Sequence, residues 1–132
     1  PDILVQSEET PRSDRHHSIL IAEDVYENYF LLETLFGKQY QLYHALNGQE
    51  AIDMFETYHP DLILMDIKMP VMDGFEATRR IRTLSKTIPI IALTAFAFER
   101  EKEIAKQCEF TDYVVKPIDI KELKKLIVKV LA

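Results

Sequence analysis

The chain has 132 residues, 47% of them hydrophobic, and a formal net charge of -6 at pH 7. This length fits one domain with a sizeable core, and the acidic balance argues against a protein that binds the phosphate backbone of nucleic acids. The single cysteine excludes an internal disulfide and is typical of a reducing compartment, and no apolar stretch approaches the roughly 20 residues of a membrane span.

The first segment, residues 1–17, reads "PDILVQSEETPRSDRHH" and is polar, charged and rich in turn-forming residues. Its apolar residues follow neither a helical nor a strand period. We therefore expect a linker or tail over 1–17 and one folded domain over 18–132.

From residue 18 on, short apolar runs alternate with stretches of helical period. Runs of four or five apolar residues with little alternation are typical of strands covered on both faces. The second run contains Gln41 and His44 and suits the edge of a sheet better. The runs that predict strands lie at 18–22, 40–45, 61–65, 88–93 and 112–115.

Three of the helical stretches begin with a capping signal, an Asn or Asp followed three residues later by Glu. These pairs are Asn47 with Glu50, Asp73 with Glu76, and Asp119 with Glu122. Gly37 is suited to end the first helix. Five strands alternating with five helices predict an α/β fold with a parallel, doubly covered sheet.

Chemistry in such sheets is expected where the strands' carboxyl ends meet the loops. Glu23 and Asp24 follow the first strand, Asp66 the third, Thr94 ends the fourth and Lys116 follows the fifth. Three acids brought together repel one another unless a cation is present. Oxygen ligands without His or Cys favour a hard metal, and so small a ligand set favours Mg²⁺ over Ca²⁺.

A carboxylate in this position can act as a nucleophile and become an aspartyl-phosphate. In that hypothesis the buried strand before Asp66 fixes the nucleophile. Lys116 and Thr94 would hold the other phosphoryl oxygens.

Four motifs occur in a fixed order: "LIAED" at 20–24, "LILMDIKMPVMDG" at 62–74, "ALTA" at 92–95 and "DYVVKP" at 112–117. With this order and spacing, residues 18–131 resemble the receiver domain of two-component response regulators. The resemblance implies a flavodoxin-like (βα)5 doubly wound fold with a parallel five-stranded sheet in the order 2-1-3-4-5.

The resemblance also implies roles for the site residues. Asp66 would accept a phosphoryl group from a phosphohistidine on a histidine kinase or histidine phosphotransfer protein. Asp24, Asp66 and the backbone carbonyl of Lys68 would ligate Mg²⁺, with Glu23 acting through a coordinated water. Lys116 would pair with Asp66 at rest and with the phosphoryl group afterwards.

A switch is implied as well. Thr94 would turn toward the phosphoryl group and Tyr113 would turn inward behind it, which changes the face formed by the fourth helix, fifth strand and fifth helix. The Lys116–Pro117 bond is expected to be cis. The domain would catalyse only its own phosphoryl transfer and hydrolysis, without contacting nucleic acid or membrane, and a homodimer through the switching face remains open.

The parent protein is a separate question. The chain carries neither an ATP-binding Gly-rich motif nor a phosphoacceptor His beside an acid, so it cannot make its own phosphohistidine. Three features favour a hybrid sensor histidine kinase as the parent: the N-terminal linker, "MPVMDG" and Asn28. The receiver is then expected in the cytoplasm, and the sequence does not decide whether the parent is anchored in the inner membrane. A stand-alone or DNA-binding response regulator is the alternative.

The sequence argues against three rival functions. A haloacid-dehalogenase-like phosphatase needs a second acid two residues after the nucleophile, where this chain has Lys68. A flavodoxin-type electron carrier needs hydroxyls and amides in the first loop, which here reads "EDVYEN". A pseudo-receiver that acts only as an interaction module is opposed by the complete site.

The sequence leaves the roles of three residues undecided. Asp24 could simply cap the first helix, since Glu27 follows three residues on. Glu109 stands where receivers often carry a glycine that supplies a left-handed turn. His44 has no acid–base partner in the sequence, and we assign it no chemistry.

Overall fold

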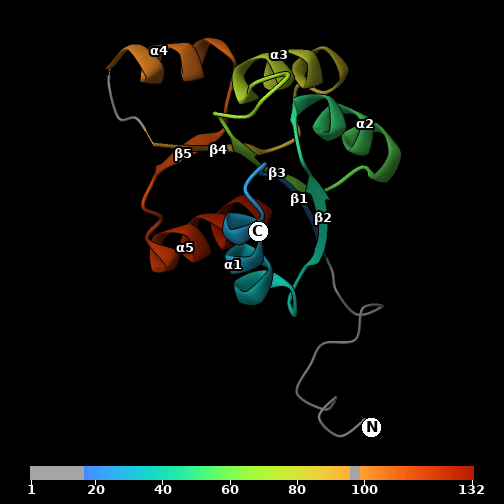
Figure 1. Cartoon of the computed structure of the whole chain (residues 1–132), viewed down its shortest axis with the longest axis vertical. Helices are drawn as coiled ribbons and strands as arrows, with labels where there is room; N and C mark the ends of the chain where they lie inside the picture. Colours follow the sequence, from blue (N-terminus) through green and yellow to red (C-terminus); the bar gives the residue numbers. More distant parts are fainter. Residues whose placement is uncertain (1–16, 96–98) are drawn as a thin grey trace, which may run out of the picture.

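A parallel five-stranded sheet between two layers of helices forms the body of the protein (Figure 1). The computed structural model describes residues 17–95 and 99–132, so the linker or tail expected at 1–17 lies outside the described residues except for His17. The elements are β1 (Ser18–Ala22), α1 (Tyr26–Phe36), β2 (Gln41–Ala45), α2 (Gly48–Tyr58), β3 (Leu62–Asp66), α3 (Gly74–Leu84), β4 (Ile90–Thr94), α4 (Glu99–Gln107), β5 (Asp112–Val115) and α5 (Ile120–Leu131).

The sheet order is β2-β1-β3-β4-β5, and all four pairings are parallel. This confirms the doubly wound order that the motifs imply. The predicted strands also lie where the apolar runs placed them. β2 is an edge strand with four half-buried residues, as Gln41 and His44 indicated.

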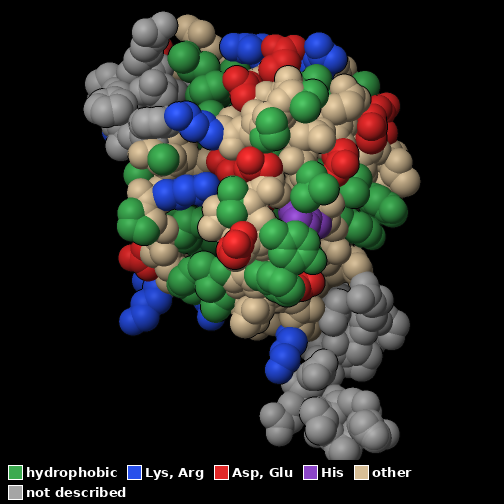
Figure 2. Space-filling model, in the orientation of Figure 1, with side chains coloured by type: hydrophobic (Ala, Val, Ile, Leu, Met, Phe, Trp, Pro, Cys, Tyr) green, Lys and Arg blue, Asp and Glu red, His purple; other side chains and the backbone are tan. Residues whose placement is uncertain are grey.

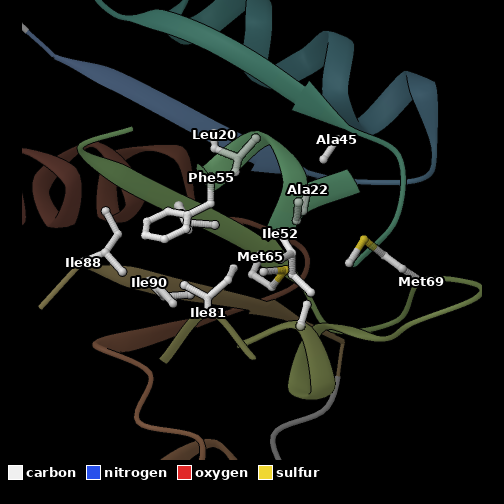
Figure 3. Packing of buried hydrophobic residues seen from close by; sticks show 13 residues of the cluster. Leu20, Ala22, Ala45, Ile52, Phe55, Met65, Met69, Ile81, Ile88 and Ile90 are labelled. Carbon is white, nitrogen blue, oxygen red and sulfur yellow. The ribbon is translucent and has the colours of Figure 1, made fainter. Parts of the chain in front are cut away.

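The core has two parts, one on each face of the sheet. Successive strand residues point to opposite faces, so Leu20 packs toward α2 and α3 while Ile21 packs toward α1 and α5. Figure 3 shows Phe55 and Ile52 of α2 against Leu20 and the other strand residues of the first part. All residues of β3 and β4 are buried, which explains why these runs lack polar alternation.

Side-chain caps start three of the helices as predicted. The Asn47 side chain accepts a hydrogen bond from the Glu50 amide at 2.9 Å, and Asp73 and Asp119 do the same for Glu76 and Glu122. Gly37 ends α1 in a right-handed conformation, with its N–H donating to the Glu33 carbonyl. No helix in the described part of the chain combines the length and apolar composition needed to cross a bilayer.

Glu109 adopts the left-handed conformation that a glycine usually provides, with φ of 63°. A buried cation fixes this turn: the Arg82 Nε donates to the Glu109 carbonyl at 2.9 Å, and its Nη1 donates to the Ile88 carbonyl at 2.7 Å. Arg82 is only 6% exposed, so these charge-assisted bonds replace its hydration. The link between α4 and β5 therefore keeps its left-handed turn without glycine.

We expect Glu109→Gly to raise the free energy of unfolding by about 1 kcal/mol, because it removes the Cβ clash of a left-handed residue. Glu109→Ala is the matched control: it keeps the Cβ and loses only the exposed contact with Lys86. Urea unfolding of both variants measures the difference. Equal stability of the two variants would mean that the turn stores no backbone strain.

Candidate functional site

The predicted site residues come together at the carboxyl ends of the strands. Carboxylate oxygens of Glu23, Asp24 and Asp66 all lie within 4.8 Å of one another. The Lys116 ammonium lies 3.4 Å from Asp66 Oδ2 and 3.6 Å from Glu23 Oε1. Figure 2 shows acidic side chains near the middle of one face, over β3 and β4, with basic side chains beside them.

Asp66 is the last residue of the central strand β3 and is 4% exposed. The Lys68 amide donates to Asp66 Oδ1 at 3.2 Å. The amide of Ile67, the residue after Asp66, donates to the Leu93 carbonyl of β4. Gly74 is needed beside it, since a Cβ there would overlap the Asp66 carbonyl oxygen. The sheet and the close approach of α3 thus leave the Asp66 carboxylate little freedom.

Glu23 is the most deeply buried acid of the three, at 1% exposure. The Val25 amide donates to its Oε2 at 3.1 Å, with Asn28 Nδ2 at 3.5 Å. Burial, and after it the charge of Asp66, raises the pKa of Glu23 to about 7. Without a cation, the carboxyl group of Glu23 therefore retains a proton until near neutral pH.

Asp24 does not cap α1. The helix begins at Tyr26, and the residue before it, Val25, makes no side-chain capping bond. The capping interpretation of Asp24 is therefore wrong. Asp24 instead lines a pocket together with Lys68, Met69 and Asp73.

The other two strands of the site carry Thr94 and Lys116. Thr94 ends β4 and is 8% exposed, and its carbonyl accepts a hydrogen bond from the Lys116 amide at 2.7 Å. The Lys116–Pro117 bond is cis, as expected. Tyr113 stands on β5 with 37% exposure, and the Lys102 ammonium lies 5.8 Å from its ring centre. Tyr113 thus lies in an outward position.

This arrangement suits a hard divalent cation. Three carboxylates converge against one ammonium, and two of the three acids are buried. A buried acid cluster is costly unless protons or a cation neutralise it. The ligands are carboxylate oxygens, which Mg²⁺ prefers. The donor set therefore fits the Mg²⁺ that the sequence predicts.

One neighbour of the site was missed by the sequence analysis. The His44 Nε2 lies 2.8 Å from the Glu23 carbonyl oxygen. The two residues are 21 positions apart, and only the parallel register, which pairs His44 with Ile21, brings them together. No motif in the sequence could have shown this contact.

Comparison with known proteins places these features in a family. The family model for the response regulator receiver domain matches residues 19–128. The regulatory protein AtoC of Escherichia coli is 38% identical over 86% of this chain, which spans 25% of AtoC. Sporulation initiation phosphotransferase F of Bacillus subtilis is 34% identical over 88% of this chain and 94% of that protein.

Solved structures agree. The receiver domain of the sensor histidine kinase PA1611 from Pseudomonas aeruginosa, with a magnesium ion coordinated in its active site cleft, has a TM-score of 0.81 and 34% identity over 87% of this chain and 97% of that chain. The receiver domain of Saccharomyces cerevisiae Ssk1, in complex with the histidine phosphotransfer protein Ypd1, has a TM-score of 0.80 and 31% identity. That match covers 86% of this chain and 87% of that chain.

The raised pKa of Glu23 predicts that protons compete with Mg²⁺. A carboxyl group with a pKa of about 7 is mostly protonated at pH 6 and ionised at pH 8. We expect Mg²⁺ affinity, measured by calorimetry, to fall roughly tenfold from pH 8 to pH 6, because the ionised fraction of Glu23 falls by that factor. Glu23→Gln should bind Mg²⁺ more weakly at pH 8, and its affinity should change little with pH. An affinity that falls with pH as steeply in this variant as in the wild type would contradict the assignment of Glu23.

Proposed function

This chain belongs to the response regulator receiver domain family, and on that premise we propose that Asp66 is the phosphoacceptor of a two-component phosphorelay. One observation carries the proposal. The Asp66 carboxylate ends a buried central strand, within 4.8 Å of two further acids and 3.4 Å from the Lys116 ammonium. Receivers use such an acid cluster to take up a phosphoryl group in two-component signalling.

In the proposed reaction, an Asp66 oxygen attacks the phosphorus of a partner's phosphohistidine. The P–N bond breaks as the new P–O bond forms, and the freed imidazole nitrogen keeps the electron pair and takes up a proton. A bound Mg²⁺ would neutralise charge on the transferred group. Asp24, Asp66 and the Lys68 carbonyl would hold this ion, and Glu23 would act through a water molecule.

Lys116 and Thr94 would serve the product state. Before transfer, the Lys116 ammonium compensates both Asp66 and Glu23. After transfer, Asp66 carries a phosphoryl group with additional negative charge, so the ammonium has a stronger partner at nearly the same place. The Thr94 hydroxyl at the end of β4 would donate to another phosphoryl oxygen.

The phosphoacceptor role can be tested directly. Incubation with acetyl phosphate and Mg²⁺ should add the mass of one phosphoryl group to the wild type, and none to Asp66→Asn, because the amide cannot act as nucleophile. Intact-mass spectrometry provides the measurement. Chelation of Mg²⁺ is the second control, and it should suppress the gain.

A folded wild type that gains no mass with Mg²⁺ present would sink the proposal. The pseudo-receiver, which acts only as an interaction module, would then be the better assignment. Retention of the gain in Asp66→Asn would instead move the phosphoacceptor to another residue.

The proposed switch couples Thr94 to Tyr113. Tyr113 is 37% exposed, and movement of Thr94 toward a phosphoryl group would leave space behind it for the ring. We expect phosphorylation to reduce nitration of Tyr113 by tetranitromethane at least threefold, since a buried phenol reacts slowly. Peptide mass spectrometry measures each tyrosine separately.

Two controls accompany this measurement. Tyr26 on α1 is 55% exposed and should be nitrated equally in both states. Thr94→Ala should accept the phosphoryl group yet leave Tyr113 exposed. Equal protection of Tyr113 in Thr94→Ala would show that Thr94 does not drive the switch.

The proposed partner is a histidine kinase or histidine phosphotransfer protein. The proposed parent is a hybrid sensor histidine kinase, in which this chain would be the cytoplasmic receiver domain. PA1611 supports this parent, because its receiver is part of a sensor histidine kinase. Sporulation initiation phosphotransferase F and AtoC represent other parents. The proposal for the signalling output includes a homodimer formed through the face of α4, β5 and α5.

A further inference from the structure

His44 contacts the acid loop from outside the site. It lies on the edge strand β2, and its Nε2 is 2.8 Å from the carbonyl oxygen of Glu23. A carbonyl oxygen can only accept a hydrogen bond, so the imidazole is the donor and carries its proton on Nε2.

The imidazole ring is held in one orientation by aromatic neighbours. It stacks on the Tyr29 ring, with a centroid distance of 3.7 Å and an interplanar angle of 1°. The Tyr26 ring meets it edge-on at 5.9 Å. Tyr29 is 7% exposed and belongs to α1, the helix that follows the acid loop. A ring fixed in this way points its donor in a defined direction.

Glu23 is consequently fixed at three points. Its N–H donates to the Ala45 carbonyl at 3.0 Å, its carbonyl accepts from His44, and its carboxylate accepts from the Val25 amide at 3.1 Å. The Glu23 carbonyl belongs to the peptide plane that leads to the α-carbon of Asp24. A hydrogen bond to this carbonyl therefore sets the direction in which the Asp24 side chain leaves the backbone.

We propose that His44 is a positioning residue for the acid pair: its Nε2–H holds the Glu23 carbonyl and thereby orients the Asp24 carboxylate toward the cation. The inference rests on the proposed function, since it concerns the Mg²⁺ that Asp24 would ligate. Groups that orient metal ligands contribute substantially to metal affinity even though they never touch the ion.

A purely structural role would depend on the stacked ring, whereas the positioning role depends on the donor. Two substitutions separate these roles. His44→Phe keeps an aromatic ring against Tyr29 and removes the donor. His44→Gln removes the ring and offers an amide N–H near the place of Nε2.

Calorimetric titration with Mg²⁺ at pH 8 measures the effect. H44F should bind Mg²⁺ about tenfold more weakly than the wild type, with a similar thermal unfolding midpoint. H44Q should bind within about threefold of the wild type, because the donor is restored. Wild-type affinity in H44F would overturn the proposal, and so would weak binding in a folded H44Q.

A second readout needs no metal. The Val25 amide, which donates to Glu23 in the same loop, should exchange its hydrogen faster in metal-free H44F than in the wild type or H44Q. If the wild type failed to bind Mg²⁺, the Mg²⁺ part of the proposed function would fail, and this exchange rate would still decide the role of His44. Unchanged exchange in H44F would then overturn it.

Discussion

The mutual repulsion of three carboxylates is the constraint on which this structure depends. Glu23 and Asp66 are nearly inaccessible to water, Asp24 lies beside them, and one ammonium, Lys116, compensates the group. Burial, and after it the charge of Asp66, raises the pKa of Glu23. A cation bound among the three acids would relieve the same charge imbalance. In the proposed function, a bound Mg²⁺ would relieve this imbalance, and Lys116 would pair first with Asp66 and then with the transferred phosphoryl group.

Maintaining this imbalance requires a scaffold that keeps the repelling groups from separating. The central strands supply it: β3 is buried over its whole length and is paired on both sides. The glycine at the start of α3 allows that helix to reach the backbone of Asp66. On the other side, the edge strand β2 holds the acid loop through the Ala45 carbonyl and His44. The rigidity of the site thus comes from elements distant in sequence.

The far end of the fold shows how a departure from a family pattern is compensated. Glu109 takes a left-handed conformation that is unfavourable for any residue with a side chain. Arg82 binds the carbonyl of that residue and two further carbonyls, which ties α3 to the links before β4 and β5. The link that leads into β5 is therefore held by hydrogen bonds to a buried cation, where a glycine would have removed the strain.

The sequence by itself determined the elements and the capped helix starts, and it predicted which residues would stand at the carboxyl ends of the strands, because apolar runs, capping pairs and motif order are local signals. Only the tertiary structure decided three further points. It showed that Asp24 does not cap α1, because this helix starts one residue later than a cap at Asp24 would require. It joined His44 to Glu23 through strand register, and it gave Arg82 its carbonyl partners. These contacts link positions far apart in the chain, and only the packing of sheet and helices brings such positions together.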